Sequence, residues 1–134
     1  MIAAGIRRAM VAHARRDAPN ECAGFLVGRG AHVIAAVPMQ NAAASRTRYR
    51  IDDAAHIELR RHLRAFSPPI TIVGVYHSHP ATAPVPSETD IAEAHYPEWC
   101  YVIVGLKGRQ ASVRAYRIRH GRTRDVTIVP TAGA

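Results

Sequence analysis

The stretch VYHSHPATAPVPSETD, residues 75–90, places two histidines one residue apart and ends with a serine and an aspartate three residues apart. In an extended chain, side chains two residues apart project to the same side, so His77 and His79 can ligate one metal ion together. A catalytic zinc site needs a third protein ligand and an open position. Asp90 is the candidate for the third ligand, because Ser87 and Asp90 would share the first turn of a helix and face roughly the same way. The residue types and their spacing therefore favour a zinc site.

Each part of this stretch also has a purely structural interpretation. A His-x-His pair by itself is a weak signal. Ser87 and Asp90 alone are typical of a helix N-terminus, where the hydroxyl accepts a hydrogen bond from a free amide and the carboxylate suits the helix dipole. Pro80, Pro84 and Pro86 alone indicate a stiff connector. The coincidence of all three features beside an apolar strand favours the metal site, with the capping residues also serving the metal.

A hydrolytic zinc site also needs a general base, because lowering the pKa of water still leaves a proton to be moved. The chain offers Glu21, which opens the apolar run of PNECAGFLVG, an unusual position for a carboxylate. The structural alternative is a solvated glutamate at the edge of a strand. On its position alone that alternative is the stronger one, so the assignment of a base needs further support.

Two apolar runs rich in β-branched residues predict strands buried on both faces, at residues 70–76 (ITIVGVY) and 99–106 (WCYVIVGL). If the first strand continues to Pro80, the two histidines stand at its carboxyl end, where open α/β sheets usually bind ligands. Further strands are predicted at residues 22–27, 32–37, 46–51, 111–118 and 123–129, with a hairpin turn at His120 and Gly121.

Apolar residues at helical spacing predict a first helix that stops before Pro19. A short helix is also predicted at residues 87–95. Between them, Asp52 or Asp53 would cap a helix that ends at Pro68 and Pro69 and buries Ala55, Leu59, Leu63 and Phe66. The order α-β-β-β-α-β-α-β-β-β predicts an α/β fold, with helices against a central mixed sheet in one domain over residues 1–134.

The formal charge of +8 and the isoelectric point near 10.5 come almost entirely from arginine, since Lys107 is the only lysine. The arginines form no block and have no interleaved aromatic residues, so nucleic acid is not favoured as a partner. A basic surface instead favours an acidic protein partner by electrostatic steering. Cys22 and Cys100 match no paired-cysteine motif and are expected to be reduced thiols. No apolar run approaches the length of about 18 residues that a membrane span needs, so we expect a cytoplasmic protein with no membrane partner.

Glu21, the run His77-Ser78-His79-Pro80, then Ser87 and Asp90 resemble the motif of the JAMM (MPN+) zinc metalloproteases, E…H-[ST]-H-P-x(6)-S-x-x-D. Flanking residues also resemble bacterial members of this family, namely ECAG at 21–24, Asn41, YRID at 49–52 and GVY at 74–76. The resemblance covers roughly residues 1–118. It implies a cytidine-deaminase-like α-β-α sandwich, in agreement with the mixed sheet predicted above.

The same resemblance implies a role for each motif residue. His77, His79 and Asp90 would bind one zinc ion per chain, with water in the fourth position. Glu21 would be the general base that takes a proton from water and passes it to the leaving amine.

Three further positions match the motif around these residues. Ser87 would donate a hydrogen bond to the oxyanion of the tetrahedral intermediate. Ser78 and Pro80 would support the site. Bacterial relatives often read Glu-Ala-Cys-Gly where this chain has Glu-Cys-Ala-Gly, but the spacing from glutamate to glycine is kept. Because every motif position is filled, the resemblance argues against the inactive, scaffolding branch of the family.

Members of this family cleave peptide or isopeptide bonds that follow the C-terminal tail of a ubiquitin-like protein. Small bacterial members typically act on sulphur-carrier proteins with a β-grasp fold and a Gly-Gly tail, and remove a C-terminal cysteine or extra residues. We expect this substrate class, because the short chain leaves little room for the inserted segments of deubiquitinases. The alternatives are a JAMM hydrolase for a peptidoglycan peptide or another ubiquitin-like conjugate, and a basic nucleic-acid-associated module. A homodimer is a further open alternative.

Overall fold

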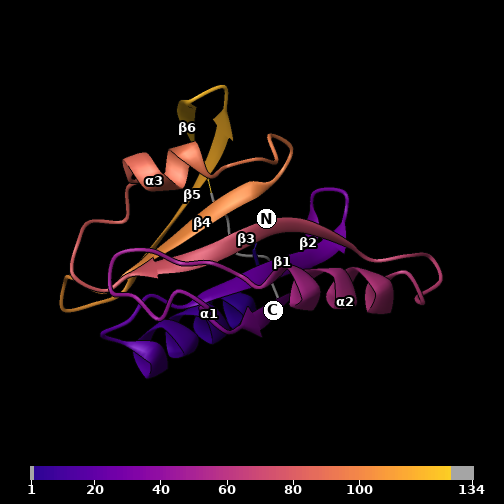
Figure 1. Cartoon of the computed structure of the whole chain (residues 1–134), viewed down its shortest axis with the longest axis horizontal. Coiled ribbons are helices and arrows are strands. Elements are labelled where there is room, and N and C mark those ends of the chain that lie inside the picture. Colours follow the sequence, from indigo (N-terminus) through magenta and orange to yellow (C-terminus); the bar gives the residue numbers. More distant parts are fainter. Residues whose placement is uncertain (1, 128–134) are drawn as a thin grey trace.

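A computed structural model of the chain describes residues 2–127 (Figure 1). Helices and strands are interspersed along it, as in an α/β fold. The elements are α1 (Ala4–Asp17), β1 (Ala23–Arg29), β2 (His32–Met39), α2 (Asp53–Leu63), β3 (Thr71–His79), α3 (Glu88–Ala92), β4 (Cys100–Gly105), β5 (Ser112–Arg119) and β6 (Arg122–Val126).

The strands form one mixed sheet in the order β2-β1-β3-β4-β5-β6. Only β3 and β4 run parallel, and every other neighbouring pair is antiparallel. Figure 1 shows α1 and α3 on opposite sides of the strands. The predicted α-β-α sandwich with a mixed central sheet is therefore confirmed.

Each face of the sheet has its own apolar core. On the α1 side, Met10 and Ala14 pack with Leu26, Tyr76 and Val102. On the side of α2 and α3, the buried cluster centres on five aromatic and aliphatic groups, Phe25, Val75, Trp99, Ile103 and Tyr116. Because side chains alternate along a strand, β3 contributes Tyr76 to the first core and Val75 to the second. His77 and His79 have the parity of Val75 and so belong to the α2–α3 side.

The predicted strand at residues 46–51 is wrong, because this segment is an irregular loop. Part of its main chain bonds to Asn41 rather than to a neighbouring strand. The amide group of Asn41 donates to the carbonyl of Arg48 and accepts from the amide of Arg50, at 3.1 Å in each case. A buried side chain therefore does for this loop what a sheet neighbour does for a strand.

The first helix stops before Pro19 as predicted, whereas the other two predicted helices exist but are shorter than expected. Asp52 is the N-cap of α2, with its carboxylate accepting from the amide of Ala55 at 3.1 Å. The helix ends at Leu63, before the two prolines, so Phe66 lies past its end and is 45% exposed rather than buried. The third helix ends at Ala92 instead of residue 95.

The two-residue turn of the last hairpin is His120-Gly121, as predicted, with positive φ at both residues. Strand β6 ends at Val126, and the rest of the predicted strand at 123–129 extends outside the described residues. Cys22 and Cys100 are both free. In the part of the chain that the structure describes, none of the helices has the length and apolar character that a membrane span requires.

Candidate active site

The carboxyl end of β3 and the first turn of α3 bring three potential metal ligands together. The Nε2 atoms of His77 and His79 lie 3.2 Å apart. The Oδ2 atom of Asp90 lies 3.2 Å from the first and 3.1 Å from the second. His77 and His79 are buried, and the side chain of Asp90 is only 8% exposed. The three residues that the spacing singled out therefore converge on one point.

This triangle of donor atoms has the dimensions of a zinc site. Ligand atoms about 2.0–2.1 Å from a tetrahedral zinc ion stand about 3.3 Å from one another. The three observed separations between the nitrogen and oxygen atoms, 3.1–3.2 Å, are close to that edge length. Two imidazole nitrogens and one carboxylate oxygen are also a donor set that zinc accepts. The residues present thus fit the metal.

The hydrogen bonds of His79 point to a cation in the same place. Its Nδ1 atom lies 2.8 Å from the carbonyl oxygen of Ala83, and a carbonyl can only accept, so Nδ1 carries a hydrogen. In the neutral ring, Nε2 then presents a lone pair to the carboxylate of Asp90. The lone pair of Nε2 and the carboxylate repel each other, so either a second ring proton on Nε2 or a metal ion bound by both groups must offset this repulsion. The pKa of His79 is raised because this carboxylate and the Ala83 carbonyl outweigh the burial that lowers it.

Asp90 is held by a capping box at the start of α3. The hydroxyl oxygen of Ser87 accepts from the amide of Asp90 at 3.0 Å, and Oδ2 of Asp90 accepts from the amide of Ser87 at 2.9 Å. Burial raises the pKa of Asp90, but the two histidines and the Ser87 amide hold it well below its usual range. The cap therefore fixes the direction of the carboxylate and keeps it ionised.

Glu21 reaches the site through the register of β1 against β3. Ala23 lies opposite His77 in the antiparallel pair, so extending the register by two residues places Glu21 opposite His79. Glu21 is 3% exposed, and its Oε1 atom is buried without a hydrogen-bond partner among residues 2–127. Burial raises the pKa of Glu21 to about 8, and Asp90 raises it while His79 lowers it. A carboxyl group next to the ligands thus has a pKa near neutrality.

Ser78 joins the two strands on the opposite face of the sheet. Its hydroxyl oxygen accepts from the amide of Cys22 at 2.8 Å, and its own amide donates to the carbonyl of Cys22. Both residues are fully buried. Since Cys22 follows Glu21 directly, this pair fixes the main chain next to the glutamate. Pro80 follows His79 at the start of the connector and is partly buried.

Two residues outside the core motif complete the site. The ring of Tyr49 stacks on His77, with ring centroids 4.4 Å apart and planes 23° apart. The loop that carries Tyr49 is anchored by Asn41, whose side-chain amide donates to the carbonyl of Glu21 at 2.9 Å. The sequence offered both residues as parts of the family resemblance, but their contacts with the site depend on tertiary structure. Asn41 therefore links Glu21 and the loop that carries Tyr49.

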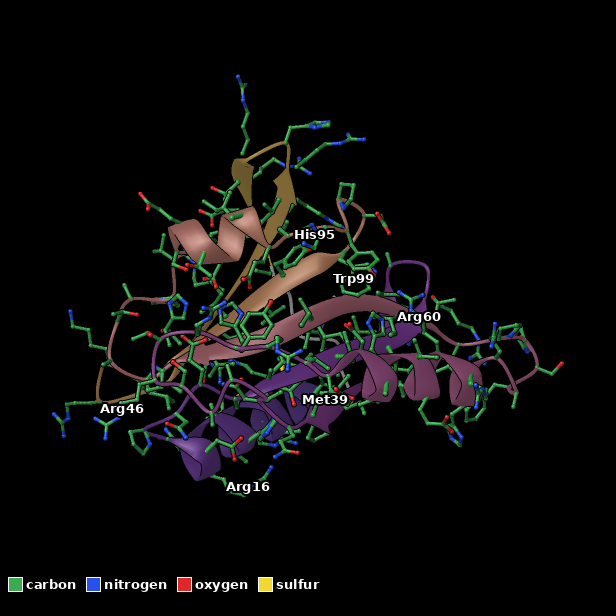
Figure 2. The ribbon with its side chains drawn as sticks, viewed as in Figure 1. Arg16, Met39, Arg46, Arg60, His95 and Trp99 are labelled. Carbon is green, nitrogen blue, oxygen red and sulfur yellow. The ribbon has the colours of Figure 1, made fainter. Side chains whose placement is uncertain are left out.

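Tyr49 also borders an aromatic cavity of about 340 Å³ on the α2–α3 side. Tyr96 and Trp99 stack in it at 3.8 Å between ring centroids, and the guanidinium of Arg60 lies 5.8 and 5.9 Å from the two rings. Figure 2 shows Trp99 beside Arg60, with His95 nearby. The cavity thus extends from Tyr49, whose ring stacks on His77, to Trp99, the residue just before β4.

The chain is similar to known proteins in sequence and fold. The family described as prokaryotic homologs of the JAB domain matches residues 3–119. The CysO-cysteine peptidase of Mycobacterium tuberculosis is 40% identical over 125 residues, which are 90% of this chain and 84% of that protein. The desampylase of Haloferax volcanii is 35% identical over 83% of this chain and 84% of its own length. A probable TtuB-protein conjugate cleaving protease of Thermus thermophilus is 34% identical over 83% of this chain and 70% of its own length.

Solved structures are also similar to this chain in fold. The protein DSY2949 of Desulfitobacterium hafniense superposes with a TM-score of 0.86 at 26% identity, over 97% of this chain and 91% of that one. AF2198, a JAB1/MPN domain protein of Archaeoglobus fulgidus, gives a TM-score of 0.66 at 17% identity, over 96% and 95% of the two chains, and is similar in fold.

Proposed function

The chain belongs to the family of prokaryotic homologs of the JAB domain, and from this we propose that it is a zinc-dependent peptidase of ubiquitin-like sulphur-carrier proteins. The bond cleaved would follow the Gly-Gly tail of the carrier and release a C-terminal cysteine or extra residues. The observation that carries the proposal is the convergence of His77, His79 and Asp90 beside the buried carboxyl group of Glu21.

The two carboxyl groups of the site have opposite environments, which supports different roles for them. Asp90 accepts from the Ser87 amide and lies against two imidazoles, so it stays ionised and suits a metal ligand. Glu21 is buried without such partners, and its pKa of about 8 is near the working pH of a general base. A cation held by Asp90 and the histidines would lower the pKa of Glu21 and favour its ionised form.

When bound, zinc supplies Lewis-acid chemistry, polarising the scissile carbonyl and making water a stronger acid. Glu21 accepts the proton of the attacking water at its carboxylate and donates it to the leaving amine. Ser87 uses a lone pair of its hydroxyl for the cap, so its hydrogen is free to donate to the carbonyl oxygen as negative charge develops. Ser78 and Pro80 hold the strand end from which the two histidines project.

The substrate class rests on the relatives. Their names refer to CysO-cysteine, to desampylation and to TtuB-protein conjugates. We propose that the present substrate is likewise a small ubiquitin-like carrier that bears an extension after its Gly-Gly tail. We further propose one zinc ion per chain, a single domain over residues 1–134 and a cytoplasmic site of action, with a homodimer as an open alternative.

The direct test is to incubate the purified protein with Gly-Gly-tailed carriers of the same genome that carry a C-terminal cysteine, and to measure their intact masses. We expect loss of one cysteine residue in the wild type, and no loss with a chelator or in Glu21→Ala. Full activity of Glu21→Ala would refute the role of the base. Cleavage of muropeptides instead of carriers would favour the peptidoglycan alternative.

A further inference from the structure

The β5–β6 hairpin carries five arginines and one aspartate between residues 112 and 126. Its register places Arg117 opposite Arg124 and Arg119 opposite Arg122. Side chains directly opposite each other in an antiparallel pair project from the same face, so these four guanidinium groups share one face of the hairpin. Like charges in such positions weaken strand pairing. The arrangement therefore lowers the stability of the hairpin and needs another explanation.

No carboxylate neutralises this set within residues 2–127. The aspartate of the hairpin, Asp125, forms its ion pair with Arg114 at 3.1 Å and has the parity of the opposite face. Elsewhere in the chain, Arg48 and Arg61 do pair with glutamates. The guanidinium of Arg117 donates only to a neutral acceptor, the main-chain carbonyl of Glu98. The four arginines are thus an uncompensated positive cluster.

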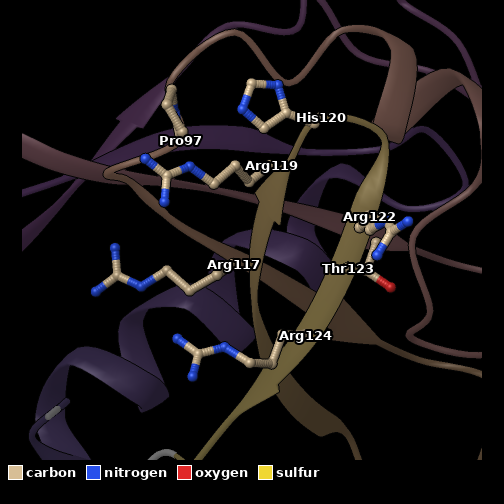
Figure 3. A pocket seen from close by; sticks show the side chains of 7 residues that line it. All are labelled: Pro97, Arg117, Arg119, His120, Arg122, Thr123 and Arg124. Carbon is tan, nitrogen blue, oxygen red and sulfur yellow. The ribbon is translucent and has the colours of Figure 1, made fainter.

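The cluster surrounds an open cavity of about 690 Å³, which Pro97, His120 and Thr123 complete (Figure 3). Figure 3 shows Arg117, Arg119 and Arg124 extending to the same side of the hairpin, with Arg119 beside Pro97. Arg119, Arg122 and Arg124 are exposed and Arg117 is half-buried. The positive charges therefore face solvent around a hollow and not the protein interior.

Protection of the sheet edge does not account for the cluster. Charged residues on an edge strand prevent strand-to-strand aggregation, and β6 is such an edge. Arg117 and Arg119, however, belong to β5, which pairs with β4 on one side and β6 on the other. Edge protection would thus explain at most the two arginines of β6. It would not explain why they lie directly opposite the two arginines of β5.

We propose that Arg117, Arg119, Arg122 and Arg124 form a docking surface for an acidic face of a folded protein. Cross-strand neighbours stand about 5 Å apart and successive rows about 7 Å apart, which matches carboxylates at i and i+4 of a helix or i and i+2 of a strand. Guanidinium groups bind carboxylates in a bidentate manner, and several pairs formed together give specificity and a fast encounter.

Other anions fit this surface less well. Single-stranded nucleic acid is held by aromatic stacking, and no Phe, Tyr or Trp lines the cavity. Duplex binding needs a longer stripe of phosphate contacts than two rows of arginines provide. A free phosphate would rely on exposed, flexible side chains in high-dielectric surroundings, where each ion pair contributes little. A partner that presents several carboxylates at once overcomes this weakness.

The docking surface is remote from the metal ligands. Ser112 pairs with Gly105, which pairs with His79, so β5 begins beside the site. Arg119 follows seven residues later, about 23 Å along the strand. The arginines also have the parity of Ala115, which lies in the core on the α1 side, opposite to His77. A docked partner would leave the metal site open, so this inference goes beyond the proposed function and is tested independently of it.

The test compares two variants that lose the same charge. One changes Arg117, Arg119, Arg122 and Arg124 to Gln. The control changes to Gln four exposed arginines that form no ion pair within residues 2–127, namely Arg8, Arg15, Arg46 and Arg64. The probe is a fluorescent helical peptide with glutamates at i and i+4 spacing, titrated at low and moderate salt. We expect the dissociation constant for the peptide to rise by about tenfold or more in the hairpin variant. In the control variant it should rise by less than about threefold.

Folding gives a second readout. Because the opposed like charges are gone, the hairpin variant should unfold at the same or a higher urea concentration than the wild type. Equal losses of peptide binding in both variants would overturn the proposal, since they would report net charge alone. Tighter binding of a 20-nucleotide single strand than of the peptide, abolished in the hairpin variant, would overturn it in favour of a nucleic-acid surface. Displacement of the peptide by micromolar pyrophosphate would overturn it in favour of a small-anion site.

Discussion

The buried hydroxyl of Ser78 gives the sharpest prediction about how the site is held. Replacing it in Ser78→Ala removes the acceptor that lies 2.8 Å from the amide of Cys22. Both residues are 0% exposed, so water cannot take the place of the hydroxyl. A buried donor without a partner costs about 1–3 kcal/mol, and we expect the free energy of unfolding to fall by about that amount.

Urea unfolding followed by fluorescence measures this loss, because Trp99 is the only tryptophan and is buried. The matched control is Ser67→Ala, which removes an exposed hydroxyl and should change the free energy of unfolding by less than about 0.5 kcal/mol. A second consequence concerns catalysis. Since Cys22 adjoins Glu21, the loosened main chain should lower kcat while zinc binding by the β3 and α3 ligands is kept.

The reasoning would be refuted if Ser78→Ala unfolded at the same urea concentration as Ser67→Ala. It would also be refuted if Ser78→Ala lost zinc as completely as a ligand variant does, since the serine would then act on the metal rather than on the strand pairing.

Three further outcomes are expected. Asn41→Ala should lower the free energy of unfolding, measured in urea, by about 2 kcal/mol or more, because it removes a buried amide that forms four hydrogen bonds. An unchanged free energy of unfolding would contradict the conclusion that Asn41 anchors the loop that carries Tyr49. Tyr49→Ala should weaken zinc affinity in a competition titration, and Tyr49→Phe should keep it, since the Tyr49 ring stacks on His77 and Phe retains that ring. Equal effects of both substitutions would argue against stacking. Burial lowers the pKa of His13, so the folded state binds a proton at His13 less readily than the unfolded chain does. The neutral ring therefore contributes stability above about pH 6.5, and this stability should be lost as the pH falls through the lowered pKa. Urea midpoints at pH 7.5 and 5.5 should differ less in His13→Gln, and an unchanged difference would exclude His13 as the cause.

The convergence of His77, His79 and Asp90 could be predicted from the sequence because the interactions that place these residues are local. Alternation along a strand puts His77 and His79 on one side, and a capping box directs Asp90. Glu21 is different, because its approach to His79 depends on the register of β1 against β3, two segments far apart in the chain. The resemblance to a family motif supplied that residue, and the spacing alone did not.

The errors arise where the residue pattern does not show which groups satisfy the main chain or where an element ends. Residues 46–51 suit a strand, but Asn41 bonds the main chain of Arg48 and Arg50 from within the loop. Phe66 has helical spacing with Leu63, yet α2 ends first and leaves the ring 45% exposed. The opposed arginines of β5 and β6 are visible in the sequence only as scattered charge, since their pairing appears once the register of the hairpin is known.

The central claim is that His77, His79 and Asp90 hold one zinc ion while Glu21 serves catalysis without holding it. Titration of zinc into chelator-treated protein, followed by calorimetry, tests this most directly. We expect one site per chain in the wild type and in Glu21→Gln, and at least about 100-fold weaker binding in Asp90→Asn, whose amide oxygen can still accept from Ser87 and keep the cap. Wild-type zinc affinity in Asp90→Asn, or loss of zinc in Glu21→Gln, would contradict the account.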